Sequence, residues 1–180
     1  MNIFPKHIGL TAISFATIAT LIYLLMINVT LTHIETLSGH APFDMRPFGY
    51  SPADAAALLD ALGAEGRAYY LSHQIPLDTL YPASLALTLI CTILWFGQSM
   101  SHRAHLAAGI LLSLGAALFD YAENLTIIAL IWNWPDTPTL LVNAASAATL
   151  LKSALTTLAV LQTLLIAILW TRSPRTKRPA

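Results

Sequence analysis

Long apolar runs separated by short polar segments are the dominant pattern of the 180-residue chain. Four of these runs, at about 8–31, 79–97, 106–132 and 140–170, are long enough for an α-helix to cross the roughly 30 Å of a bilayer's hydrocarbon core. The last run is longer than a crossing needs, so we expect it to tilt or to protrude. The pattern predicts an all-α polytopic membrane protein, a four-transmembrane-helix bundle that forms a single membrane domain over residues 1–180.

The segment between the first two runs, residues 32–77, has the features of a folded outer cap. Ser51, Pro52 and Asp54 form a helix start, with serine as the N-cap, proline at the first helical position and an acid three residues after the cap. The apolar positions that follow share one helix face: Ala55, Leu58, Leu59 and Leu62. We therefore predict an extracytoplasmic amphipathic helix that lies on the outer membrane surface or closes the end of the bundle.

Composition supports the membrane assignment and excludes other classes of protein. Hydrophobic residues make up 56% of the chain and charged residues 10%, whereas an ordinary soluble domain has about 25% charged residues. Nine basic residues balance nine acidic ones, and this argues against a nucleic-acid partner, which would require a basic surface. The single cysteine, Cys91, cannot form an internal disulfide.

Lysine and arginine are distributed unequally over the segments that connect the runs. The outer side of the predicted topology holds only Arg46 and Arg67, and the other side holds a larger set: Lys6, Arg103, Arg172, Arg175, Lys177 and Arg178. Because positive charge is enriched on the cytoplasmic side, we expect both termini to be cytoplasmic and residues 171–180 to form a flexible basic tail. The first run exceeds the length of a signal-peptide core, so we expect an uncleaved span.

Asp120 and Glu123 lie within the third apolar run, where ionisable residues are rare. They share one helix face with three small residues in steps of three and four: Gly109, Ser113 and Ala116. Small residues allow a neighbouring helix to approach, so we expect both carboxylates to point into the bundle. Counting about 1.5 Å per residue, Asp120 lies about 17 Å from the outer end of its run and Lys152 of the fourth run about 18 Å, so the two can meet.

Two interpretations of these three charges are open. In the first, Asp120, Glu123 and Lys152 form an ion-pair network that joins helices. In the second they form a catalytic site, in which two neighbouring carboxyls exchange a proton and the lysine stabilises negative charge or binds an anionic headgroup. One lysine can neutralise only one of two acids, and intramembrane ionisable residues are functional by default, so we favour a site.

The predicted substrate-binding residues come mainly from the outer segment. Asn124 would orient the substrate from the third run, and the outer set comprises Arg46, Arg67, Tyr50, Tyr70, Asp78 and Tyr81. Arginine can bind phosphate or carboxylate with two hydrogen bonds, although both arginines could instead pair with the acids of the cap. The outer His33, Glu35, His40 and His73 match no zinc motif, and we expect no metal and no cofactor.

Four segments together resemble a set of small bacterial four-span inner-membrane proteins. They are the run Phe43-Asp44-Met45-Arg46-Pro47-Phe48-Gly49-Tyr50, the stretch from Gly63 to Tyr70, the pair Tyr81-Pro82, and the run Asp120-Tyr121-Ala122-Glu123-Asn124. The resemblance implies a multi-pass protein of the bacterial inner (plasma) membrane and carries no particular activity.

Functions from different classes fit this pattern. We favour a lipid- or apolar-metabolite-active enzyme or binding protein that uses acid–base chemistry at the intramembrane acids. The alternative is a non-catalytic subunit or assembly factor of a membrane complex, and proton or ion translocation is the less favoured third hypothesis. Membrane lipids are the expected partners, with a homo-oligomer or a larger membrane complex as further assemblies and no nucleic acid.

Overall fold

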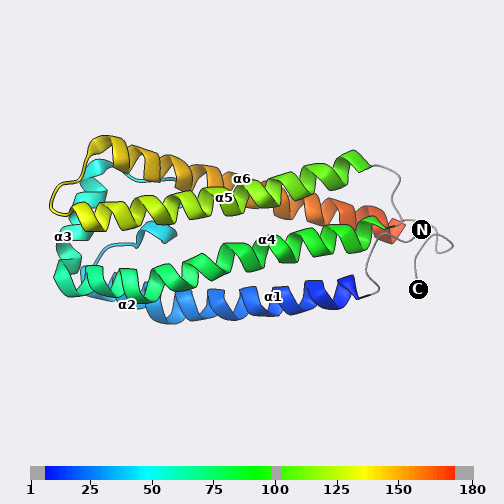
Figure 1. Ribbon diagram of the computed structural model, residues 1–180, viewed down its shortest axis with the longest axis horizontal. Helices are drawn as coiled ribbons and strands as arrows, with labels where there is room; N and C mark the ends of the chain where they lie inside the picture. Colours follow the sequence, from blue (N-terminus) through cyan, green and yellow to red (C-terminus); the bar gives the residue numbers. More distant parts are fainter. Residues whose placement is uncertain (1–6, 99–102, 173–180) are drawn as a thin grey trace.

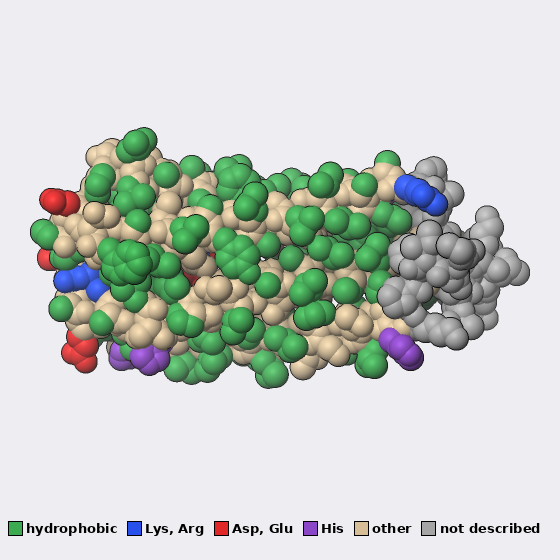
Figure 2. Space-filling model, viewed as in Figure 1, with side chains coloured by type: hydrophobic (Ala, Val, Ile, Leu, Met, Phe, Trp, Pro, Cys, Tyr) green, Lys and Arg blue, Asp and Glu red, His purple; other side chains and the backbone are tan. Residues whose placement is uncertain are grey.

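The computed structural model describes residues 7–98 and 103–172, and every regular element in these ranges is a helix. Four long helical rods lie side by side along the longest axis of the molecule (Figure 1). Each rod is long and apolar enough to cross a membrane, as the hydrophobic pattern predicted. Charged and histidine side chains on the face shown in Figure 2 gather at the two ends, and hydrophobic side chains cover most of the length between them.

The first rod is longer than the apolar run that predicted it. Helix α1 (Ile8–Leu25) continues through a π-helical turn, η1 (Met26–Thr30), into α2 (Leu31–Ser38), so the helix ends seven residues beyond the predicted limit at 31. The rod stops at Gly39, whose φ of 69° is left-handed and whose N–H bonds to the carbonyl of Glu35 at 2.8 Å. The extra turns are amphipathic, because Leu31 and Ile34 are buried whereas their polar neighbours are exposed.

The second rod begins with a helix that lies across one end of the bundle. Helix α3 (Pro52–Tyr69) starts at the predicted capping box, in which the Ser51 side chain accepts from the Asp54 N–H at 3.2 Å. Gly63 breaks this helix with a φ of 61°. The chain then continues without interruption through η3 (Tyr70–Gln74) into α4 (Ile75–Gly97), so the predicted start of the second span near 79 lies inside a longer helix.

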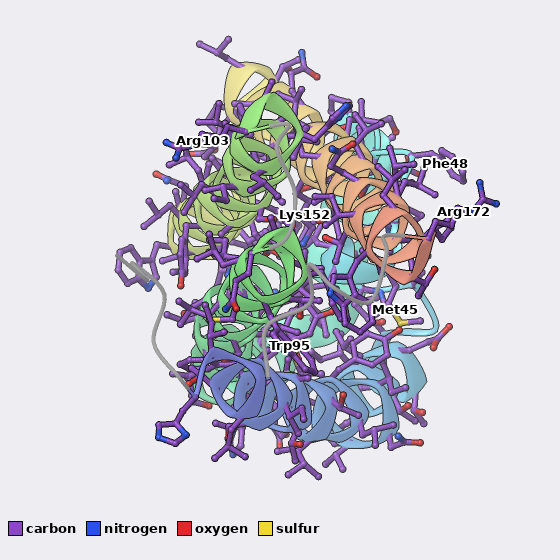
Figure 3. All side chains as sticks on the ribbon, turned by 90° about the vertical axis from the view of Figure 1, so that its right-hand side faces the viewer. Met45, Phe48, Trp95, Arg103, Lys152 and Arg172 are labelled. Atoms are coloured by element: carbon purple, nitrogen blue, oxygen red, sulfur yellow. The ribbon has the colours of Figure 1, made fainter. Side chains whose placement is uncertain are left out.

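The two remaining rods form a hairpin. Helix α5 (Arg103–Asn133) and helix α6 (Thr139–Arg172) pack against each other along most of their length, and α6 also contacts α4. Helix α1 packs on the other side of α4. In the view along the bundle, Met45 lies between α6 and the first rod (Figure 3).

The largest hydrophobic core lies at the α3 end of the bundle. The predicted apolar face of α3, residues 55, 58, 59 and 62, is buried there together with side chains from the neighbouring ends of α5 and α6. The short 3₁₀ turn η2 (Phe43–Met45) adds Phe43, which is fully enclosed. This packing holds the segment between Gly39 and Ser51 against the bundle. Asp44 of this segment consequently lies at the end of a cavity between the rods.

Candidate functional site

Lys152 of α6 lies between two carboxylates of α5. Its Nζ is 3.1 Å from Asp120 Oδ1 and also forms an ion pair with Glu123 Oε2. Asp120 and Glu123 are one helical turn apart and face the interior of the bundle, so a single ammonium group reaches both. The lysine thereby links α6 to α5 at the position of the two acids, and its one positive charge pairs with two carboxylates.

Glu123 is the more enclosed of the two acids. Its side chain has no solvent exposure, and its second oxygen, Oε1, accepts a hydrogen bond from the hydroxyl of Thr149, one turn before Lys152 on α6. Asp120 retains some exposure and lines a cavity. The sequence predicted the same environment for both acids, but their positions differ. Glu123 pairs with Lys152 on the side away from the cavity, and Asp120 lines the cavity.

Asn124 stabilises the same region by supplying a hydrogen bond that the backbone of α4 lacks. Pro82 in α4 has no N–H, so the carbonyl of Asp78, four residues earlier, lacks its usual helical donor. The side-chain amide of Asn124 supplies that donor at 2.9 Å. One turn earlier on α5, the hydroxyl of Tyr121 donates to the carbonyl of Thr79 at 3.0 Å. Polar side chains of α5 thus stabilise α4 where proline interrupts it.

Asp78 brings a third acid to the cluster, and Asp44 brings a fourth. Asp78 is 2% exposed, and its carboxyl contacts that of Asp44 in η2. The Asp44 carboxyl also accepts a hydrogen bond from the hydroxyl of Tyr70. One oxygen of each carboxyl, Asp44 Oδ1 and Asp78 Oδ2, is buried without a hydrogen-bond donor from the described part of the chain. The site thus holds two acids that contact each other beside the lysine-bridged pair.

A cavity of about 390 Å³ lies between α1 and α6 and reaches these acids. Its polar end is formed by carboxyls and the ammonium group, from Asp44, Asp78, Asp120 and Lys152. Side chains of the first rod form one wall and those of α6 the opposite wall. The first wall comprises Tyr23 of α1, Met26 and Ile27 of η1 and Leu31 of α2, and the second comprises Ser153, Thr156 and Thr157. Met45 and Tyr23 are close to half exposed, so the cavity extends to the outer surface of the bundle.

The cavity has an apolar extension. A second hollow of about 180 Å³ follows the seam between α1 and α4 and shares Tyr23, Tyr81 and Leu85 with the first. Its remaining lining consists of small or hydroxyl-bearing side chains: Ala16, Ala19, Thr20 and Thr88. Together the two hollows form an elongated groove with charged groups at one end and an uncharged seam leading away from them.

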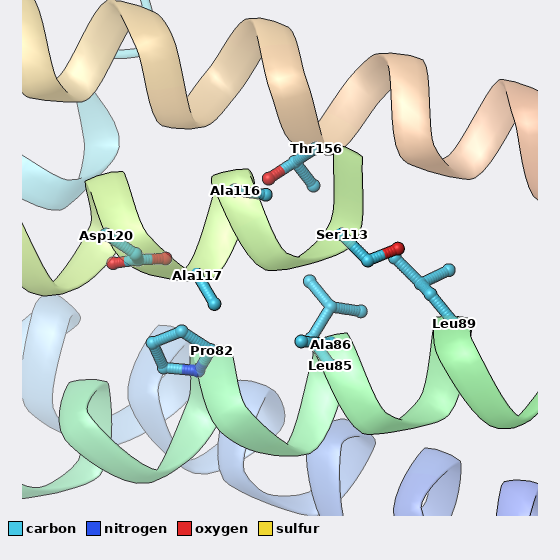
Figure 4. A pocket seen from close by; sticks show the side chains of 9 residues that line it. All are labelled: Pro82, Leu85, Ala86, Leu89, Ser113, Ala116, Ala117, Asp120 and Thr156. Atoms are coloured by element: carbon cyan, nitrogen blue, oxygen red, sulfur yellow. The ribbon is translucent and has the colours of Figure 1, made fainter. Parts of the chain in front are cut away.

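Asp120 has a closely packed floor on its other side. Between α4, α5 and α6 there is a small pocket of about 10 Å³, bordered by Pro82, Ala117 and Ser113 among others (Figure 4). Among the described residues that line it, Asp120 is the one ionisable residue. Of the two hollows that Asp120 lines, the larger cavity is therefore the one with room for a molecule bigger than water.

The structure separates the predicted site residues into groups. Asp120, Lys152, Asp78 and Tyr81 line the cavity, and Tyr81 stacks on Tyr23 with ring centroids 5.7 Å apart. Glu123 and Asn124 lie directly behind this lining, each bonded to one of its members.

Tyr50 and Tyr70 lie above the cavity and pack against Phe43, with ring centroids 4.8 and 6.1 Å away. The Tyr50 N–H donates to the hydroxyl of Ser146 at 2.9 Å, which joins this segment to α6. Burial raises the pKa of Tyr50 above its usual range, so the phenol stays neutral. The two tyrosines therefore hold the roof of the cavity rather than line it.

Neither predicted arginine lines the cavity. Arg46 donates through Nε to the carbonyl of Ala41 at 2.9 Å. Arg67 bonds to the carbonyl of Leu59, and its guanidinium lies 5.2 Å from the ring centroid of Trp134. Both are used to hold the turns and helices around α3, so neither adds positive charge to the acid cluster.

Asp44 and Thr149 are not among the predicted catalytic or substrate-binding residues. Asp44 lies in a polar segment between helices, where an acid is normally solvated, and only the burial of neighbouring Phe43 brings it into the bundle. Thr149 belongs to a regular stripe of hydroxyl residues on α6, and that stripe was its only signal. In the described ranges, no group of three or more histidine, cysteine, aspartate and glutamate side chains has a geometry that could hold a metal ion.

Comparisons with protein-family models, with curated proteins and with solved structures found no match. The class that the fold defines is an all-helical protein with four candidate membrane spans. The interpretation of its cavity therefore rests on the geometry of the chain itself.

Proposed function

We propose that the chain is an integral protein of the bacterial inner membrane that binds a lipid or another amphiphilic molecule in the cavity between α1 and α6. The observation that carries the proposal is the position of Asp120 and Lys152. They meet the cavity at its inner end, while its walls are helices long and apolar enough to lie in a bilayer. The ligand's polar group would contact the charged end, and its apolar part would follow the seam between α1 and α4.

The proposed placement in the membrane follows from the distribution of charge. With both termini cytoplasmic, α3 and the turn at 133–138 lie on the outer side, and the acid cluster lies in the outer half of the bilayer. Helix α3 then forms the extracytoplasmic cap, supported by the burial of its apolar face on the ends of α5 and α6. A lipid in the outer leaflet could enter sideways between α1 and α6 without crossing the cap.

The chemistry that this arrangement supports is acid–base chemistry at Asp120. Its carboxyl is the group that contacts both the cavity and the ammonium of Lys152, so it can take or give a proton next to a bound molecule. Glu123 would act as a positioning residue, because it holds Lys152 from behind and has no access to the cavity. The bond that would change in the ligand depends on the identity of that ligand.

Native mass spectrometry of the purified protein in nanodiscs tests the binding proposal. The variant Ser153→Phe places a ring in the cavity, and Ala154→Phe is its matched control because the neighbouring Ala154 is exposed on the outside of α6. We expect a retained amphiphile in the wild type and in Ala154→Phe, and its loss in Ser153→Phe. Equal retention in all three proteins, or none in the wild type, would overturn the proposal.

A role in chemistry is tested by lipid analysis of cells that express the variants. We expect Asp120→Asn to abolish any change in the lipid profile that the wild type produces, and Asp136→Asn to preserve it, because Asp136 is exposed at the turn between α5 and α6. A lipid profile that is the same with and without the wild-type protein would limit the function to binding.

A further inference from the structure

The charge around the cavity is unbalanced, and this imbalance indicates the chemistry of the ligand. Among the described residues that line it, Asp44, Asp78 and Asp120 are acidic and Lys152 is the one basic residue. That lysine is already engaged by two carboxylates, Asp120 in the lining and Glu123 behind it. An incoming anionic group would therefore meet a cation that is already paired with two carboxylates, together with two further carboxyls, Asp44 and Asp78.

A second, independent observation concerns Asp78. Its side chain is 2% exposed and lines the cavity, and its Oδ2 has no hydrogen-bond donor within the described part of the chain. It contacts Asp44, whose Oδ1 is equally without a donor. Two carboxyls in contact repel each other unless a proton or a cation lies near both, and a buried acceptor without a donor is costly. The contact between these two acids can therefore hold either a shared proton or a hydrogen-bond donor that carries positive charge.

The aromatic lining is consistent with a cation. Tyr23 and Tyr81 stack on each other at the point where the cavity joins its apolar extension. The face of an aromatic ring attracts an ammonium group within about 6 Å, more strongly when the group is desolvated. The seam beyond these rings, between α1 and α4, has a volume of about 180 Å³, and no charged side chain is among the described residues that line it.

We propose that the cavity selects an amphiphile whose polar end is a protonated amine, with the ammonium group bound between Asp44, Asp78 and Asp120 and the alkyl chain along the α1–α4 seam. The inference rests on the proposed function, since it names the class of ligand for the same cavity. Lys152 then has the role of setting the charge of the site. It cancels part of the negative charge and leaves enough to hold one cation.

The experiment compares three probes that share one alkyl chain: dodecylamine, dodecanol and dodecanoate. Their binding to the full chain in nanodiscs of zwitterionic lipid is measured by native mass spectrometry and by the shift in unfolding temperature. A charge-assisted hydrogen bond is stronger than a neutral one, so we expect dodecylamine to bind about tenfold to a hundredfold more tightly than dodecanol, with dodecanoate the weakest. Equal or weaker binding of the amine would overturn the inference.

Two variants assign the preference to the acids. Asp78→Asn and, separately, Asp44→Asn keep the size of the side chain and remove one negative charge, and each should reduce the preference for the amine at least severalfold. Asp136 is exposed and is not among the residues that line the cavity, so Asp136→Asn should leave the preference unchanged. If one acid variant fails to fold, the other still tests the assignment, and a preference that persists in a folded variant contradicts it.

The variant Ser153→Phe separates failure of this inference from failure of the proposed function. If it blocks all three probes while the wild type binds them equally, the cavity binds amphiphiles without selecting amines, and only the inference is wrong. If the probes bind the wild type and Ser153→Phe alike, they do not occupy the cavity, and the proposed function fails with the inference.

Discussion

The side-chain amide of Asn124 in α5 donates to the backbone carbonyl of Asp78 in α4, at a distance of 2.9 Å. This carbonyl is the acceptor that Pro82 leaves without a helical partner. The hydrogen bond therefore replaces a missing backbone bond with one from a neighbouring helix. It also fixes the position of Asp78, whose side chain extends from the same residue into the cavity.

A double-mutant cycle tests this replacement. We expect Asn124→Leu to lower the free energy of unfolding by about 1 kcal/mol, because it leaves a buried carbonyl without a donor. In a Pro82→Ala background the new backbone N–H can serve that carbonyl, so the same substitution should cost clearly less. Reversible unfolding in detergent measures all four proteins. An equal cost of Asn124→Leu in both backgrounds would contradict the proposed compensation.

Removal of the lysine should be more damaging than removal of an acid. Lys152→Met leaves Asp120 and Glu123 buried without a cation, and we expect it to lower the free energy of unfolding by roughly 3–5 kcal/mol. Adding Glu123→Gln to that variant removes one uncompensated charge and should recover part of the loss. The measurement is the same unfolding assay, and a Lys152→Met protein as stable as the wild type would disprove the importance of this ion pair.

The side chain of Thr149 should stabilise the fold through its hydrogen bond to Glu123 rather than through packing. Thr149→Val keeps the shape of the side chain but removes the donor to Glu123 Oε1, and we expect a loss of roughly 1–3 kcal/mol, as for other buried charged acceptors. Thr149→Ser retains the hydroxyl and loses only a methyl group, so it should be closer to the wild type. The order of the two variants in unfolding temperature decides the point, and a more stable valine variant would refute it.

Gly63 provides a test of backbone conformation that is separate from packing. Its φ of 61° and ψ of −173° are accessible almost exclusively to glycine, while a Cβ at this position would meet nothing within 4 Å. We expect Gly63→Ala to cost roughly 1–3 kcal/mol through strain alone.

Gly39 is the matched position for this test. Its Cβ would also meet open space, but its φ of 69° and ψ of 9° are in the left-handed region that asparagine tolerates. Gly39→Asn should therefore be milder than Gly63→Ala when both are measured by thermal unfolding. The reverse order would show that the turn at Gly63 can relax.

Local features of this protein could be predicted from the sequence because they depend on neighbouring residues. The lengths of the apolar runs gave four helices of spanning length, and the Ser51–Asp54 pair marked the start of α3 where the structure has it. Helical periodicity also placed Asp120 and Glu123 on one face with small residues. Hydropathy is less informative at the ends of the rods, where α2 and η3 extend the helices through polar residues whose partners lie elsewhere in the chain.

Only the tertiary structure decided which of these side chains meet. Asp44 and Asp78 are 34 positions apart, and their contact depends on the packing of Phe43 beneath α3. Long-range packing likewise decides which acids are buried and which are solvated. It also decides that Lys152 points to the acid cluster whereas Arg46 does not. The apolar pattern determines where helices form and which face of each is buried, because each residue contributes to that pattern independently. A cavity is a gap between helices, so its position and lining depend on how all the helices pack together.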